Sequence, residues 1–242
     1  MGFGDSYNAV YGDEKVDFFD LSHRFPRNRT EALVWLTPAA ETVLEIGFGN
    51  GNAIYNLRNR AERLFGVEVS DKRCTKVQAK LEAAQINGKC MVGNIEEGLD
   101  FPNHYFDVII WADVIEHVVD LWKAMGEINR LLKIGGSLVT ITPNVAYIKR
   151  RWMLLMGKFP STSGSDEGLG VRPGEMFDGG HLHYFTFSSL EKLYKKYGLR
   201  PKLCLGYGPL GKFHNFLPRL LSNSLGLVGE KVTDFDFPIA CK

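Results

Sequence analysis

The 242-residue sequence lacks the features that mark secreted, disulfide-linked and membrane-spanning proteins. Its four cysteines are scattered without a C-x-x-C pair, so we expect neither a disulfide framework nor a structural zinc site. No apolar run approaches the ~18 residues of a membrane span, and the N-terminus has neither the basic nor the apolar region of a signal peptide. These absences predict a cytoplasmic protein with reduced thiols.

The sequence also lacks a charge excess of either sign. It has 29 basic and 28 acidic side chains, a net charge of only +1, so no overall field favours nucleic acid or an anionic membrane. Apolar residues make up 45% of the chain, which is enough for a sizeable core. The length fits a single α/β domain over residues 1–242 that includes an insertion.

A short apolar segment followed by a glycine turn is the most informative stretch. The β-branched run at 42–46 predicts a buried parallel strand, and Gly47, Gly49 and Gly51 come directly after it. Glycine permits positive φ and lets a ligand approach the backbone closely. The helix expected from Asn52 would also present free N–H groups at this turn. The stretch therefore predicts a cofactor site.

The spacing of the glycines bears on which cofactor binds. A dinucleotide fingerprint needs glycine at the position of Asn52, so the spacing disfavours NAD and with it a dehydrogenase. Glu45 lies two residues before the first glycine, where a carboxylate would repel a pyrophosphate. An acid at this position suits a cationic ligand.

The E-x-G-x-G-x-G pattern from Glu45 to Gly51 resembles motif I of the class I S-adenosylmethionine-dependent methyltransferases. Their ligand carries an ammonium and a sulfonium group. The resemblance covers roughly residues 30–230. Within the family, the sequence is similar to the branch that is common in small-molecule and glycan pathways. It implies a Rossmann-like α/β fold with a seven-stranded, mostly parallel sheet and an insertion after strand 5. It also implies S-adenosylmethionine as cofactor and methyl transfer as activity.

Two later segments extend the expected cofactor site. Glu68 ends a second apolar strand seventeen residues beyond Gly51, close to the ~20-residue offset at which an acid binds ribose in nucleotide-binding βαβ units. Asn94 and Ile95 match the family segment that binds the adenine amine and packs on its ring. The expected cofactor-binding residues are Glu45, Gly47, Gly49, Gly51, Glu68, Val69, Asn94 and Ile95.

Polar side chains follow the apolar strand at 106–112, where the carboxyl end of a parallel strand would face a ligand. Asp113, Glu116 and His117 lie there. An imidazole with an ordinary pKa near ~6.5 can accept a proton at neutral pH, so His117 is a candidate base. The D-x-x-E-H spacing is also similar to the metal-binding trio of ubiquinone-biosynthesis O-methyltransferases, and a structural role is a third possibility. We expect no bound metal, because such turns are widespread in family members without one.

Two segments flank this core. The N-terminal 1–40 is expected to form a helical lid over the cofactor, with Tyr11, His23 and Arg27 as candidates, or simply to pack on the sheet. Residues 145–186 are expected to form the acceptor-site insertion, beginning with a basic amphipathic helix at 147–158. That helix suits a phosphorylated, lipid-linked or membrane-bound acceptor, or forms a solvated charged face. Strand-like alternation would place His181 and His183 on one face.

The sequence thus predicts methyl transfer to an oxygen of a small molecule, a metabolite or a glycan precursor. The candidate catalytic residues are Asp113, His117, His181 and His183. An N-methyltransferase, an aminopropyltransferase and a non-catalytic S-adenosylmethionine-binding protein remain alternatives. Nucleic acid is not an expected substrate, because Pro143-Asn144 is not preceded by the D/N-P-P-Y/F signature and the chain has no Pro-Cys dipeptide.

Overall fold

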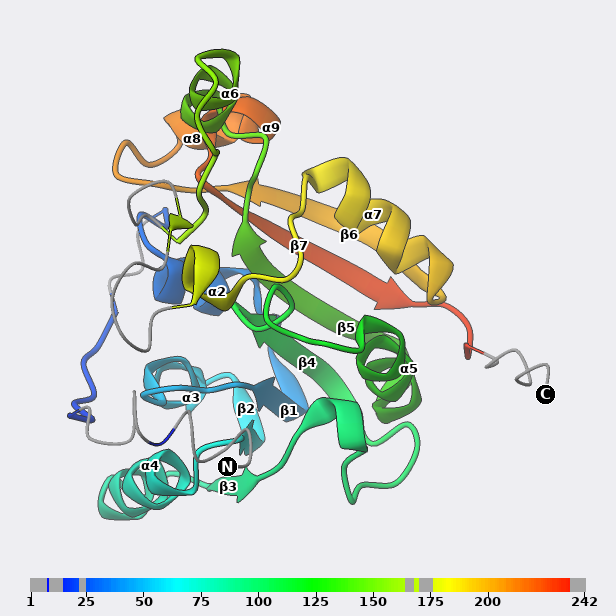
Figure 1. The fold of residues 1–242 in the computed structure, drawn as a ribbon. Helices are drawn as coiled ribbons and strands as arrows, with labels where there is room; N and C mark the ends of the chain where they lie inside the picture. The colour runs from blue at the N-terminus through cyan, green and yellow to red at the C-terminus, as the bar shows by residue number, and fades with distance from the viewer. Residues whose placement is uncertain (1–7, 9–14, 22–24, 164–167, 170–175, 236–242) are drawn as a thin grey trace.

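The structure is a computed structural model that describes residues 8, 15–21, 25–163, 168–169 and 176–235. Its centre is a seven-stranded sheet in the order β3-β2-β1-β4-β5-β7-β6 (Figure 1). The strands are β1 Ala40–Ile46, β2 Ala61–Glu68, β3 Gly88–Val92, β4 Phe106–Ala112, β5 Leu132–Pro143, β6 Leu199–Gly206 and β7 Ser224–Lys231. Strands β1 to β5 pair in parallel, whereas β7 is antiparallel to both β5 and β6. The predicted fold class is confirmed.

Helices cover both faces of this sheet (Figure 1). They are α2 Arg29–Leu36, α3 Asn52–Leu57, α4 Asp71–Ala83, α5 Leu121–Leu131, α6 Ile148–Leu155, α7 Phe187–Lys196, α8 Phe213–Phe216 and α9 Pro218–Leu221. Two short 3-10 turns, η1 Ile95–Glu97 and η3 Phe177–Gly180, lie in loops. One buried cluster joins the sheet to α2, α3 and α4, and a second joins it to α5 and α7. The sheet is therefore buried on both sides, as parallel sheets usually are.

The two central strands, β1 and β4, explain where the loops meet. Most residues of both strands are buried, as expected for central strands that are covered on both faces. Ile46 pairs with Trp111, so the two strands end side by side. The turns after β1, β2, β3 and β4 consequently gather at one edge of the sheet, the place where ligands bind in folds of this kind.

The segment between β5 and α7 leaves the sheet and returns to it through an isolated bridge between Asn144 and Phe185. Arg150 of α6 is buried and holds this segment in place, since its Nη1 donates to the carbonyl oxygens of Asn144 and Asn223, both at 2.7 Å. Asp178 is also buried and accepts hydrogen bonds from Ser161 Oγ and Thr162 Oγ1 at 2.6 and 2.7 Å. These bonds lower the pKa of Asp178 against the effect of burial. None of the described helices is both long and apolar enough to cross a bilayer.

Candidate active site

A cavity of about 510 Å³ opens at the carboxyl edge of β1, β2, β3 and β4. Six of the eight predicted cofactor residues line it: Gly47, Gly49, Glu68, Val69, Asn94 and Ile95. Glu45 and Gly51 do not line it. Of the predicted catalytic residues, Asp113 and His117 line the cavity, whereas His181 and His183 do not.

The glycines of the turn are required for different reasons. Gly47 has φ +68°, and a Cβ there would lie 2.3 Å from Val114 Cγ2, so side-chain packing excludes any larger residue. Gly49 has φ +55°, but a Cβ there would meet only Arg73 Nη1 at 3.9 Å. Gly51 is the N-cap of α3, and a Cβ there would lie 2.6 Å from Val77 Cγ1. Gly49 is therefore the glycine whose open side faces the cavity.

Glu68 ties the glycine turn to the end of β2. Its Oε2 accepts from the backbone N–H of Gly49 at 3.1 Å, and its Oε1 accepts from Val69 N–H at 2.9 Å. The side chain is almost fully buried yet borders the cavity. Oε1 also accepts from Ser70 N–H at 3.3 Å. Each carboxylate oxygen has about two acceptor positions, so Oε2 retains capacity for a ligand hydroxyl group.

Glu45 is buried at the end of β1 and is not fully satisfied. Its Oε2 has no hydrogen-bond partner among the described residues. Burial raises the pKa of Glu45 to about 8, although the nearby Arg29 guanidinium opposes the rise. A cation close to this carboxyl group would favour its charged form. The sequence analysis predicted a cationic ligand at this position for the same reason.

Arg29 is a cavity residue that the sequence did not identify. It lies at the start of α2, and its Nη1 forms an ion pair with Asp113 Oδ2 at 2.9 Å. Burial acts to lower the pKa of Arg29, but the carboxylates of Asp113 and Glu45 outweigh it and raise the pKa. Asp113 itself has φ +51°, a left-handed conformation that is uncommon outside glycine. No local pattern could reveal a contact between residues 84 positions apart.

The N-terminal segment contributes Arg29 and Thr30 to the cavity lining. The lid candidates Tyr11 and His23 lie outside the described residues. Arg27 is exposed, and its backbone N–H donates to Glu31 Oε2 at 2.8 Å. Residues 15–21 run along α3, where the N–H of Phe19 donates to Asn52 Oδ1 at 3.2 Å.

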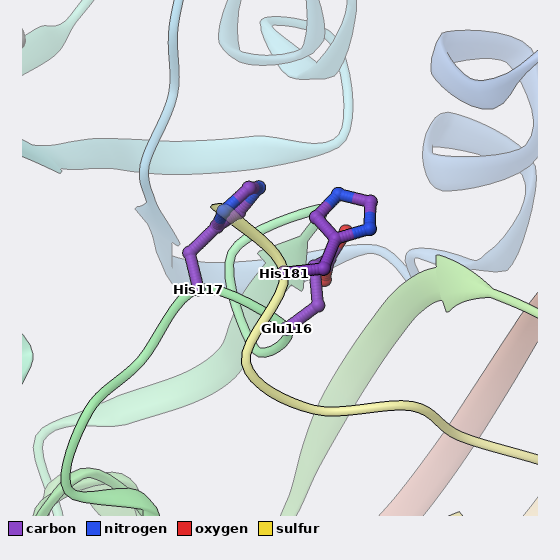
Figure 2. A group of neighbouring side chains, drawn as sticks. All are labelled: Glu116, His117 and His181. Carbon is purple, nitrogen blue, oxygen red and sulfur yellow. The ribbon is translucent and has the colours of Figure 1, made fainter. Parts of the chain in front are cut away.

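His117, which lines the cavity, lies next to His181 (Figure 2), with ring centroids 4.7 Å apart. His117 Nδ1 lies 3.2 Å from the carbonyl oxygen of Gly180. A carbonyl can only accept, so this hydrogen bond assigns the proton to Nδ1 and leaves a lone pair on Nε2. Burial lowers the pKa of His117, which keeps the ring neutral at pH 7.

A chain of two hydrogen bonds through Thr162 holds His181 in the same tautomer. Thr162 Oγ1 donates to Asp178 Oδ2 at 2.7 Å, so it accepts from His181 Nδ1 at 2.6 Å. Nε2 of His181 then carries the lone pair. Burial, together with the neighbouring His117, lowers the pKa of His181. Two neutral imidazoles with unprotonated Nε2 atoms thus lie side by side.

Glu116 completes this cluster. It is buried, accepts from Thr142 Oγ1 at 3.0 Å, and has its pKa raised to about 8, chiefly by burial. One ligand atom from each of Glu116, His117 and His181 lies within 4.8 Å of the others, a grouping that could hold a divalent metal ion (Figure 2). Asp113, the remaining acid of the D-x-x-E-H turn, is paired with Arg29 instead.

His183 lies apart from this pair. Its Nε2 donates to the carbonyl oxygen of Val118 at 2.8 Å. Residues 181–184 form no strand, so the alternation expected from the sequence does not govern where these side chains lie. The backbone N–H groups of Leu182 and His183 both donate to the carbonyl oxygen of Glu116, which brings His181 beside His117.

The sequence and the fold both match known proteins. Residues 44–140 match the family model described as a methyltransferase domain. The chain is 31% identical over 107 residues to a ubiquinone/menaquinone biosynthesis C-methyltransferase of Francisella tularensis subsp. novicida, covering 42% of each protein. It is 30% identical over 103 residues to a ubiquinone biosynthesis O-methyltransferase of Paramagnetospirillum magneticum, covering 43% of this chain and 41% of the relative. The chain therefore spans about two fifths of the length of these relatives.

Solved structures extend the likeness to the whole fold. Geranyl diphosphate C-methyltransferase from Streptomyces coelicolor, solved with Mg²⁺, geranyl diphosphate and S-adenosyl-L-homocysteine, superimposes with a TM-score of 0.64 at 14% identity. That match covers 96% of this chain and 99% of the other. A methyltransferase from Methanosarcina mazei gives a TM-score of 0.59 at 18% identity over 81% of this chain and 94% of the other.

The cavity lies at the sheet edge where ligands bind in folds of this kind, and the strand-end carboxylate of Glu68 lines it. The unsatisfied buried acid, Glu45, directly precedes the cavity-lining Ile46. These groups fit a ligand that carries both a positive charge and a ribose. Residues 44–140 thus match a methyltransferase domain, and the seven-stranded fold is similar to that of solved methyltransferases.

Proposed function

We propose that the protein transfers a methyl group from S-adenosylmethionine to an oxygen atom of a small-molecule acceptor. One observation carries the proposal. A single cavity is bordered by the glycine turn and Glu68 on one side and by His117, with its lone pair on Nε2, on the other. When bound there, S-adenosylmethionine supplies a methyl group on a positively charged sulfur.

The cofactor side of the cavity offers a group for each part of that molecule. Glu68 Oε2 has acceptor capacity for a ribose hydroxyl, and Asn94 and Ile95 follow β3 in the cavity wall, where the adenine ring would pack. Arg29 suits the carboxylate of the methionine moiety, because its guanidinium lines the cavity. The carboxylate of Asp113 pairs with Arg29, and Glu45 is buried nearby. A bound ammonium or sulfonium group would favour the charged form of Glu45.

On the acceptor side, His117 is placed to take a proton from a hydroxyl group. Its lowered pKa keeps the base form present at pH 7, and the bond to Gly180 fixes the ring orientation. His181 packs against this ring from a separate segment. Holding the two reactants in line contributes up to ~7–11 kcal/mol to such a reaction, so positioning supplies most of the rate and the base supplies the rest.

An amine acceptor is the alternative, because an amine can lose its proton to water without help from His117. A radiolabel experiment distinguishes the two. The protein is incubated with S-adenosylmethionine tritiated in the methyl group and with polar and lipid fractions of a cell extract. We expect the label in a product whose methyl group is bound to oxygen. Label bound only to nitrogen would replace the proposal with N-methylation, and no transfer to any fraction would contradict it.

A further inference from the structure

Two segments at one end of the molecule form a surface that the methyl-transfer proposal does not use. They are residues 144–163, which include α6, and residues 207–223, which include α8 and α9. Figure 1 shows these three helices together, beyond the start of β7 and away from α3, α4 and α5. We call the two segments the α6–α9 lobe.

The lobe exposes an unusual amount of apolar surface. Leu155 and Phe216 are 74% and 77% exposed, and Trp152 is 62% exposed. Single exposed apolar side chains are normal in folded proteins, but a cluster of them on adjacent elements marks an interaction site. The apolar side chains of the lobe that are at least 45% exposed are Ile148, Trp152, Leu154, Leu155, Met156, Leu210, Phe213, Phe216 and Leu217.

The lobe is also strongly basic. Its two segments contain six basic residues and neither Asp nor Glu: Lys149, Arg150, Arg151, Lys158, Lys212 and Arg219. Because the whole chain has a net charge of +1, the rest of the chain has a net charge of −5. Arg150 is buried and Arg219 forms an ion pair with Glu191, whereas Lys149, Arg151 and Lys212 are exposed.

The two segments are fixed to each other. Arg150 Nη1 donates to the carbonyl oxygens of both Asn144 and Asn223 at 2.7 Å. Asn144 Nδ2 donates to the carbonyl oxygens of Arg219 and Ser222 at 3.3 and 3.0 Å. The apolar side chains of α6, α8 and α9 are therefore held on a common base and not on independent loops.

We propose that the α6–α9 lobe docks on the surface of an anionic lipid bilayer. Exposed Trp, Phe, Leu and Met side chains bury well at the boundary between head groups and acyl chains, and basic residues beside them attract anionic head groups. A second copy of the chain would bring two basic surfaces together, which charge repulsion opposes. A nucleic acid would match the positive charge but would leave the aliphatic side chains exposed.

This inference rests on the proposed function and narrows its acceptor to a hydroxyl-bearing amphiphile presented by the bilayer. The lobe is connected directly to the histidine pair. Arg150 Nε donates to the carbonyl oxygen of Ser161 at 3.0 Å, and the next residue, Thr162, holds His181 Nδ1 at 2.6 Å. Docking of the lobe would therefore bring the histidine side of the cavity towards the lipid surface.

Co-sedimentation with lipid vesicles tests the proposal. The wild-type protein is mixed with vesicles of phosphatidylcholine alone or with 30% phosphatidylglycerol. We expect binding to the anionic vesicles to be at least roughly tenfold stronger than to the neutral ones and to weaken as salt is added. The double variant Leu155→Glu/Phe216→Glu should lose that binding, since it places acids at the two most exposed apolar positions.

The matched control is Ile134→Glu/Leu203→Glu, which changes two exposed apolar residues outside the lobe and should bind vesicles like the wild type. Equal vesicle binding by the Leu155→Glu/Phe216→Glu protein would overturn the proposal. The proposal would also be overturned if light scattering showed a wild-type dimer that this variant abolishes and the wild type did not bind vesicles. All variants should bind S-adenosylhomocysteine normally. Failure of every protein to bind it would refute the methyltransferase proposal without affecting the vesicle result.

Discussion

The two sides of the cavity are built in different ways. On the cofactor side, turns that directly follow β1, β2 and β3 contribute the polar groups, and Gly49 and Glu68 meet across only 19 positions of sequence. On the acceptor side, His117 meets Gly180 and His181 from a segment more than 60 positions further along. The first side carries acids around Arg29, whereas the second carries neutral imidazoles. Substitutions should therefore separate cofactor binding from turnover.

The largest expected effect is on turnover through the acceptor side. His117→Ala should lower kcat by ~10²–10⁴ while cofactor affinity changes little, because it removes the proton acceptor and leaves Glu68 and the glycine turn intact. Steady-state kinetics and calorimetry with S-adenosylhomocysteine measure the two quantities. His183→Ala is the control, since that ring bonds only to the backbone of Val118 among the described residues. If His117→Ala lowers thermal stability and cofactor affinity together, the residue is structural and not a base.

Two glycine substitutions on the cofactor side should distinguish an effect on cofactor binding from an effect on the stability of the fold. Gly49→Val should nearly abolish binding of S-adenosylhomocysteine, since a β-branched residue disfavours φ +55° and projects from the turn that borders the cavity. Gly47→Ala should instead destabilise the fold by ~1–3 kcal/mol, because its Cβ would clash with Val114. Calorimetry and thermal unfolding measure the two effects. Normal binding by a folded Gly49→Val protein would contradict the assignment of the turn.

The same contrast explains what the sequence could predict. The strands, the glycine turn and Glu68 were predictable because each is a local pattern, and the parallel topology then brings their ends to one edge. Arg29 was not predictable, since its partner Asp113 is 84 positions away. The His117–His181 contact depends on two backbone bonds to Glu116, which no periodicity encodes. The α8–α9 part of the α6–α9 lobe was not predicted, because two four-residue helices are too short to give a helical pattern in the sequence.

The pH dependence of stability should reveal one buried acid on each side. The pKa values of Glu45 and Glu116 are raised from 4.5 to about 8 in the folded protein, chiefly by burial. Between these values the folded chain binds more protons than the unfolded chain, so the free energy of unfolding falls as the pH rises. We expect the Tm to fall between pH 6 and 8. Glu45→Gln and Glu116→Gln should each flatten that fall, and a Tm that rises with pH over this range would contradict both assignments.

The smallest expected effect is that of chelation. We expect activity to survive EDTA, because Arg29 engages Asp113 and a neutral His117 can accept a proton without a metal ion. Activity assays after dialysis against EDTA check this. Loss of activity that Mg²⁺ or Zn²⁺ restores would instead assign Glu116, His117 and His181 as metal ligands, since these three already lie within reach of a single ion.

The central claim is that the edge of β1, β2 and β3 binds S-adenosylmethionine. Calorimetric titration with S-adenosylhomocysteine tests it most directly. We predict one site per chain with micromolar or tighter affinity, no binding of NAD, and a loss of ~1–3 kcal/mol in Glu68→Ala from the missing ribose hydrogen bond. Glu62→Ala, an exposed acid on the same strand, should bind like the wild type. A folded protein that binds NAD instead, or a Glu68→Ala variant with unchanged affinity, would contradict the account.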